Sequence, residues 1–448
     1  IKKFLYNYNK YQTNSFYVEL GLQRFGDFYL NNIFKDGKIA GGRSDYVRLF
    51  SIVAIFILII ACINFMNLTT ARSARRAKEI GVRKVAGAVR PVLVRQFLSE
   101  AMMITALSVG VALTLVVMVL PFFNQLTGKQ IELPVSKYYF WISVAALTLI
   151  TGILSGSYPA VFLSGFKPIT VLKGSLKFSN SSKLFRKGLV VFQFVLSFVL
   201  IAATILIARQ VNYIQEIKLG FDRENLVVLT IEGELKSKYQ FFKQQVLNET
   251  GIKSVSRMGE TPTNIGSTTG GIDWIGKNAN TTPMFKNTAV GFDYVKTMGL
   301  ELVGGRDISK DFASDSAGYL VNESAVKLMG YKDPVGKPLT QWGVKGSIVG
   351  VLKDFHFASI HGPILPLVLR NGEKDDWGSI LVRTEAGKTK QALANLEKVW
   401  KSVNPKFPFT YSFASEEYNN LYKSEQTVSK LSAWFAFLGI FVSCLGLL

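Results

Sequence analysis

The sequence predicts a membrane protein: an α-helical transmembrane bundle, with about five spans in this chain, and a large extracytoplasmic α+β domain. Two observations predict this fold class. Five segments contain no ionisable side chain over roughly 18–25 residues, the length that a helix needs to cross a bilayer. Charged residues make up only 19% of the 448 residues, whereas about 25% is usual in soluble domains.

The few charges are strongly biased, with 52 Lys or Arg against 31 Asp or Glu and a net charge of +21. Such a balance is typical of nucleic-acid-binding proteins and also of membrane proteins with basic inner loops. Residues 72–95 hold eight basic residues and one acidic, and 166–187 hold six basic and none acidic, so these loops carry +13. The positive-inside rule makes both loops cytoplasmic. Topology therefore explains the charge, and we expect no nucleic acid partner.

The elements follow in order from this topology. The predicted transmembrane helices are 48–71, 98–122, 138–165, 188–212 and 429–448, the last being the truncated start of a further span. Between them we expect the end of a first extracytoplasmic domain (1–47), a cytoplasmic loop (72–97), a short outer loop (123–137), a second cytoplasmic loop (166–187) and a large outer domain (213–428). The span interiors contain no ionisable group, which argues against an ion-driven carrier.

Smaller features of the spans predict how they pack. Gly152, Gly156 and Pro159 are expected to allow close approach and a kink. Asn64, Asn67 and Gln193 are the strongest polar groups at membrane depth, and hydrogen bonds between helices would satisfy them.

The outer domain alternates strand and helix patterns at both of its ends. Residues 224–231 and 252–258 are predicted strands around a helix at 236–250, and 379–384 and 407–413 are predicted strands around a helix at 388–403. Two βαβ units would therefore flank an inserted β-rich lobe at about 288–350. Residues 414–430 are expected to form a helix that continues without a break into the last span.

Candidate catalytic and metal-binding motifs are weak. Gly271–Asn278 has the G-x-x-x-x-G-K spacing of a phosphate-binding loop, but Asn278 stands where Ser or Thr should be and no helix pattern follows. His356, His361 and Asp354 could together supply three metal ligands, although a spacing of five residues suits neither a helix face nor a strand face. We therefore expect no metal, no cofactor and no catalytic residue in this chain.

The most informative motif is E-I-G-x-R-K-x-x-G-A at 79–88. Helical spacing places Ile80, Gly81 and Lys84 on one stripe, and a second stripe carries Arg75, Arg76, Glu79 and Arg83. Gly87 then ends the pattern. This string resembles the cytoplasmic coupling loop of FtsX-like and MacB-like ABC transporter permeases. SGSYPAVFLSGFKPITVLKG (155–174), FDYVKTMGLELVGGRDIS (292–309) and VGVLKDFHFASIHGPILPLVL (349–369) are similar to other parts of that family.

The resemblance implies a permease subunit that acts by mechanotransmission. A cytoplasmic ABC ATPase dimer would bind ATP, and the coupling loop would pass its closure through the spans to the outer domains for export or efflux. The contact would be made by Glu79, Ile80, Gly81, Arg83, Lys84 and Gly87, whereas Arg75 and Arg76 could equally bind membrane lipid headgroups. The chain itself would not be an enzyme.

The resemblance also implies the bacterial inner membrane, with the large domain in the periplasm and a periplasmic adaptor or outer-membrane protein as a further partner. The order of elements is similar to the middle of a double-length member. An FtsX-type regulator of cell-wall hydrolases and a membrane-tethered sensor or enzyme remain as alternatives. The substrate, the oligomeric state and the presence of a fused ATPase domain stay open.

Overall fold

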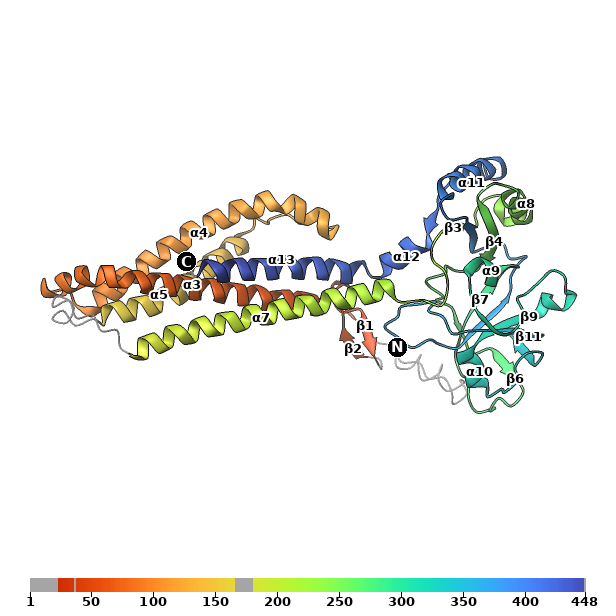
Figure 1. The fold of residues 1–448 in the computed structure, drawn as a ribbon, viewed down its shortest axis with the longest axis horizontal. Helices are drawn as coiled ribbons and strands as arrows, with labels where there is room; N and C mark the ends of the chain where they lie inside the picture. The colour runs from red at the N-terminus through yellow and green to blue at the C-terminus, as the bar shows by residue number, and fades with distance from the viewer. Residues whose placement is uncertain (1–22, 36–37, 166–179, 447–448) are drawn as a thin grey trace. The chain divides into compact units, whose positions relative to one another are not determined.

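The computed structural model describes residues 23–35, 38–165 and 180–446, and the chain divides into two compact units (Figure 1). The membrane unit comprises residues 23–212 and 424–446, and the outer domain comprises Tyr213–Lys423.

Within the described residues of the membrane unit, five helices are long and apolar enough to cross a membrane, as predicted. They are α3 (Arg43–Val85), α4 (Arg90–Thr127), α5 (Tyr138–Ser164), α7 (Asn180–Glu216) and α13 (Lys423–Leu445). They follow a one-turn helix, α2 (Phe25–Phe28), and a hairpin of two short strands, β1 (Ile33–Lys35) and β2 (Lys38–Gly41).

Glycine allows α5 to pack closely against α4. A methyl group added at Gly156 would lie 2.7 Å from the Cβ of Ala101, and one added at Gly152 would collide with the sulfur of Met102. Carbon atoms in contact are normally about 3.5–4.0 Å apart, so neither position has room for a larger residue. The close packing expected from these two glycines is therefore present.

Neutral polar groups join α13 to its neighbours α3 and α7. The amide of Asn64 donates to the carbonyl of Val442, and the amide of Gln193 donates to that of Ser443 at 3.3 Å. The hydroxyls of Ser197 and Ser443 lie 2.6 Å apart. Hydrogen bonds between helices thus use the N–H groups of both amides, as the sequence suggested, whereas the side-chain oxygen of Asn64 is buried without a hydrogen-bond partner among the described residues. Asn67 is also buried.

The outer domain is built on one mixed β-sheet. Its strand order is β14–β3–β13–β4–β7–β12–β9–β11–β10–β6, with β5 beside β7 and β8 beside β11. The first four in this order come from the two ends of the domain: β14 (Ser412–Phe413), β3 (Leu226–Thr230), β13 (Ser379–Thr384) and β4 (Ile252–Met258). Together with α8 (Leu235–Leu247) and α11 (Thr389–Val403), they form the two predicted βαβ units, although the last strand, expected over 407–413, contains only Ser412 and Phe413.

These four strands carry a core on each face because their side chains alternate. Val227 and Leu229 pack with α8 and α11, around the fully buried Trp400. Leu226 and Val228 belong to the opposite core, which also includes residues of α9 (Tyr294–Met298) and α12 (Ala414–Leu421). The predicted α+β class is confirmed.

The β-rich segment between the two units extends from β5 to β12, over 268–371, which is a longer stretch than the expected lobe at about 288–350. It contains β5 (Thr268–Thr269), β6 (Ile272–Trp274), β7 (Phe285–Val290), β8 (Leu302–Gly305), β9 (Gly318–Asn322), α10 (Glu323–Met329), β10 (Pro338–Gln341), β11 (Val344–Leu352) and β12 (Leu367–Asn371). A single residue pair, Met258 with Val290, joins this segment's strands to β4.

The helix expected to run unbroken from 414 into the last span is interrupted. α12 ends at Leu421, and Tyr422 has φ −110° and ψ 20°, outside the helical range, before α13 begins at Lys423. The stretch NNLYKSE contains neither glycine nor proline, so neither of these helix-breaking residues accounts for the break.

Candidate functional site

The segment expected as a cytoplasmic loop, 72–97, is a helical hairpin. α3 continues as helix past the apolar span to Val85, and α4 begins at Arg90. Gly87 lies in the connecting turn with φ +95°, a backbone conformation that favours glycine, and no atom lies within 4 Å of where a Cβ would be. Pro91 follows in the first turn of α4, where its missing N–H needs no partner.

The inner stripe of the hairpin packs into the membrane unit. Ile80 is 1% exposed and forms a cluster with Leu93, Phe97 and Ala160. Gly81, beside it, is buried. Since Ala160 belongs to α5, this cluster fixes the hairpin against a third helix.

Two basic residues of the hairpin hold the end of α5. Lys84 donates from Nζ to the carbonyl of Ser164 at 2.6 Å, and Arg90 donates from Nε to the Ser164 hydroxyl at 3.3 Å. Ser164 is the last residue of α5, so its carbonyl has no partner within the helix. Positive charge at a helix C-terminus is also stabilising.

The outer stripe remains accessible. Glu79 pairs with Arg83 at 2.7 Å, one helical turn away, and Arg83 also donates to the side chain of Gln96 on α4 at 3.0 Å. Both members of the ion pair are about half exposed, so the pair itself adds little stability. The side chains of Arg75 and Arg76 lie outside the described residues.

Four valines make the accessible side of the hairpin apolar. They are 57–68% exposed, and we call them the valine surface: Val82, Val85, Val89 and Val92. Apolar side chains exposed beyond the apolar span are available for contact with lipid or with another molecule. This surface was not predicted from the sequence, although Val82 and Val85 stand three residues apart on the side away from Ile80. The role of Ser164 was not predicted either, because no local pattern links residues 84 and 164.

The weak motifs of the outer domain are explained by its structure. Lys277 of the phosphate-loop-like string donates to the carbonyl of Ile272 and pairs with Asp273 at 2.7 Å, so it holds its own turn. Asp354 accepts from the backbone and hydroxyl of Ser324, at 3.0 and 2.6 Å, and thereby holds the first turn of α10. Over 23–35, 38–165 and 180–446, no three His, Cys, Asp or Glu residues are grouped to bind a metal.

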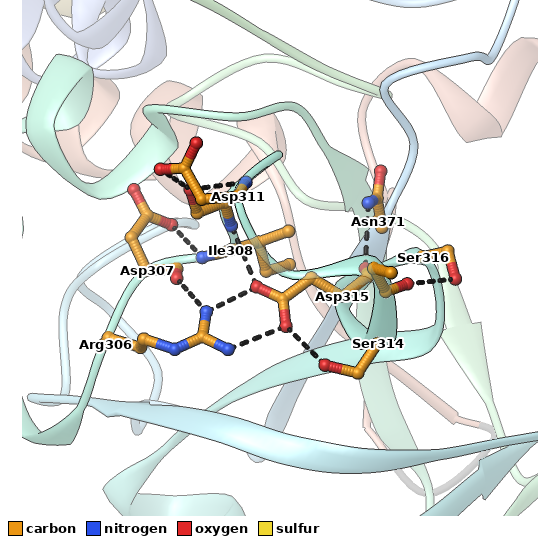
Figure 2. Close-up of polar contacts among 10 residues, drawn as sticks. Arg306, Asp307, Ile308, Asp311, Ser314, Asp315, Ser316 and Asn371 are labelled. Carbon is orange, nitrogen blue, oxygen red and sulfur yellow. Dashed lines mark hydrogen bonds and ion pairs between the residues drawn. The ribbon is translucent and has the colours of Figure 1, made fainter.

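The G-G-R-D string at 304–307 is also structural (Figure 2). Arg306 donates to both carboxylate oxygens of the fully buried Asp315, and its guanidinium lies 3.6 Å from the centre of the Phe312 ring. The side chain of Asn371 donates to the Asp315 carbonyl at 2.9 Å. The hydrogen bonds from Arg306 lower the pKa of Asp315. This network fixes the loop between β8 and β9.

Asp307, next to it, accepts from the backbone N–H groups of Val295 at 2.9 Å and Ile308 at 2.8 Å. Burial nevertheless raises the pKa of this carboxyl from 3.8 to about 6. The described part of the outer domain thus offers no grouped catalytic constellation, and the hairpin is the strongest candidate functional site.

Comparison with known proteins points to the same segment. Residues 51–168 match the family model described as FtsX-like permease C-terminal. The macrolide export ATP-binding/permease protein MacB of Campylobacter jejuni (strain 81-176) is 30% identical over 149 residues, 33% of this chain and 23% of that protein. MacB 2 of Yersinia pestis bv. Antiqua (strain Antiqua), which carries the same description, is 31% identical over 167 residues, 35% of this chain and 23% of that protein.

The matches span about a quarter of the length of these curated relatives. Two solved structures are similar to the chain. The periplasmic region of MacB from Actinobacillus actinomycetemcomitans is 18% identical with a TM-score of 0.34, and the match covers 46% of this chain and 97% of that one. The extracellular domain of the ABC-type transporter YknZ from Gram-positive bacteria is 17% identical with a TM-score of 0.30, and the match covers 42% of this chain and 97% of that one. The family-model match and the two MacB relatives confirm the resemblance inferred from the sequence motifs.

Proposed function

We propose that this chain, an ABC-transporter permease of the MacB/FtsX type, receives the movement of a cytoplasmic ATPase dimer at the α3–α4 hairpin and passes it to the outer domain. The observation that carries the proposal is the division of the hairpin into two sides. Its inner side is fixed to α5 by Ile80 and Lys84, and its outer side presents Glu79 and the valine surface. A hairpin built this way would be displaced by a partner that binds its accessible side, and it would move α5 with it.

The division assigns different roles to the residues expected at the ATPase contact. Glu79 and Arg83 would touch the ATPase, because their side chains are accessible. Ile80, Gly81 and Lys84 would instead transmit the movement, since they pack against or bond to the membrane helices. Gly87 would allow the tight turn that brings α4 back. ATP would be hydrolysed by the partner ATPase or by an ATPase domain fused to this permease.

Co-purification tests the proposal. The tagged full-length protein is isolated in detergent, and the eluate is examined by mass spectrometry and by an ATPase assay. We expect an ABC ATPase in stoichiometric amount, and Glu79→Lys should reduce its recovery at least tenfold because the substitution reverses a charge on the accessible side and places two positive charges one turn apart. Unchanged recovery and unchanged ATPase activity in this variant would exclude the hairpin as the contact.

Glu132→Lys is the matched control, since it makes the same charge change at an exposed residue of the short loop between α4 and α5. It should leave ATPase recovery unchanged. Val85→Thr keeps the Glu79–Arg83 pair and the side-chain shape, and it replaces an exposed methyl group by an uncharged hydroxyl, so an equal loss in this variant would support the valine surface as part of the contact.

The topology of the proposal is a multi-pass protein of the bacterial inner membrane whose outer domain lies in the periplasm, where an adaptor or outer-membrane protein could bind it. Ser237 is exposed on α8, and Ser237→Cys supplies a reactive thiol there. In whole cells with a permeabilised outer membrane, this thiol should react with an impermeant maleimide. Labelling that occurs only after lysis of the inner membrane would reverse the assigned orientation.

A further inference from the structure

Two segments connect the outer domain to the membrane helices, and a tyrosine bonds them together inside the domain. The first segment is the last turn of α7, and the second is α12. Tyr418 of α12 is 2% exposed and donates its hydroxyl hydrogen to the carbonyl of Ile214 at 2.7 Å. Ile214 lies in the final turn of α7, where backbone carbonyls have no helical partner, so Tyr418 caps that helix.

Arg223 reinforces this cap. Its guanidinium donates to the carbonyl of Gln215, the neighbouring terminal carbonyl of α7, and lies 4.6 Å from the centre of the Tyr418 ring. A positive charge at a helix C-terminus is stabilising, and so is a cation over an aromatic face. Burial raises the pKa of the Tyr418 hydroxyl to about 12, so this group keeps the proton that it donates.

A second tyrosine, one helical turn after Tyr418, links the end of α12 to the β-rich segment. Tyr422 is 2% exposed, and its hydroxyl accepts from the backbone N–H of Ile360 at 2.8 Å. Its ring lies 5.0 Å from the Tyr418 ring and 5.8 Å from the ring of His361, measured between ring centres. Ile360 belongs to the loop 353–362, which directly follows β11.

The loop 353–362 is bonded to the α7 side as well. The N–H of His356 donates to the carbonyl of Leu219 at 2.7 Å, three residues after α7 ends. At Gly220, with φ +86°, an added methyl group would lie 2.7 Å from the Cβ of Phe355. The loop therefore contacts the chain entering the domain and the chain leaving it.

We propose that Tyr418 and Tyr422 together form a clasp: their hydroxyl groups bond the end of α7, α12 and the loop 353–362 to one another, so that these three segments move as one body. The helix break at Tyr422 marks the end of this body. The clasp rests on the proposed function, because it would pass the movement of the spans to β11 and the rest of the β-rich segment. Tyr422 is thus a positioning residue: its hydroxyl group ties the loop to α12 at the residue where α12 stops being helical.

Tyr422→Phe removes the acceptor and keeps the ring, so the full-length complex with its ATPase should still assemble. Hydrogen exchange followed by mass spectrometry measures both parts of the proposal. In the variant we expect the Ile360 amide to exchange at least tenfold faster. We also expect the difference in exchange at 353–362 between ATP-bound and nucleotide-free complex, present in the wild type, to be lost. Tyr411→Phe, at an exposed tyrosine of the same domain, is the control and should change neither.

Each outcome is decisive. Unchanged exchange at Ile360 in Tyr422→Phe would disprove the clasp. Faster exchange at Ile360 with an intact ATP-dependent difference would show that the bond exists but transmits nothing, which also overturns the proposal. A wild-type protein that binds no ATPase would overturn the proposed function, and a wild type that binds ATPase without an ATP-dependent difference at 353–362 would overturn the clasp alone. Tyr418→Phe, which should speed exchange in the last turn of α7, provides a second variant.

Discussion

In the described membrane unit, the buried side chains Asn64, Gln193 and Ser197 join helices through neutral groups, whereas the outer domain also buries charges in connected networks. Asn64, Gln193 and Ser197 each make one bond to α13. In the outer domain, Glu373 is 6% exposed, accepts from the backbone of Phe292 at 2.7 Å and lies 3.7 Å from the ammonium group of Lys243.

The difference follows from the surroundings of each unit. A charge at membrane depth is costly, and hydrogen bonds between helices contribute only about 0.6 kcal/mol each on average, so helices held by them can shift at low cost. A buried charge network must stay complete, because a single broken contact leaves a charge without compensation. The outer domain is therefore expected to move as a rigid part, and the membrane helices to rearrange.

The strongest test of this comparison removes a charge from the network. Glu373→Ala leaves the Phe292 N–H and the amide of Gln240, which donates to Glu373 at 2.7 Å, without their acceptor. It also removes one of the two carboxylates beside the buried Lys243, which keeps Asp293 at 3.3 Å. We expect a loss of about 3 kcal/mol in the free energy of unfolding of the outer domain. Urea unfolding in detergent, followed by tryptophan fluorescence, measures it. Glu385→Ala, an exposed acid paired with Lys388, is the control; an equal effect there would refute the contrast.

A pH dependence should follow from Asp307. Its pKa is raised from 3.8 to about 6, so the folded state holds this proton more tightly than the unfolded state does. The resulting stability is complete below about pH 4 and is lost as the pH rises through about 6, by about 2 kcal/mol for a half-buried group. Asp307→Asn should abolish this slope in urea unfolding between pH 4 and 7. Asp311→Asn, in the same loop, should keep it.

The smallest effect is expected in the membrane unit. Ser197→Ala removes the hydroxyl contact with Ser443 and should lower the free energy of unfolding by about 0.6 kcal/mol. Thermal unfolding in detergent would show a shift of a few degrees at most, and Ser108→Ala, which bonds only within α4, should show less. A loss of several kcal/mol from Ser197→Ala would contradict the view that these helices rearrange easily.

Local patterns predicted much of this fold, and distant contacts made up the rest. Apolar runs without charge located the five spans, and helical spacing separated the buried Ile80 from the accessible Glu79. The bond from Lys84 to Ser164 and the pairing of Tyr418 with Ile214 join residues 80 and 204 positions apart, so no local pattern contains them. The helix break at Tyr422 was not predicted either: it lies at a residue whose hydroxyl bonds to Ile360, 62 positions away, and neither glycine nor proline marks it in the sequence.

The continuity of α3 has a geometric consequence. At 1.5 Å per residue, its 43 residues form a rod about 65 Å long, roughly twice the thickness of the bilayer's hydrocarbon core. If the rod pivots at its own midpoint, a tilt of about 10° displaces each end by about 6 Å in opposite directions. A sideways displacement of the α3–α4 hairpin would then move Arg43 in the opposite direction. The movement would be carried by one continuous helix, with no break between its two ends.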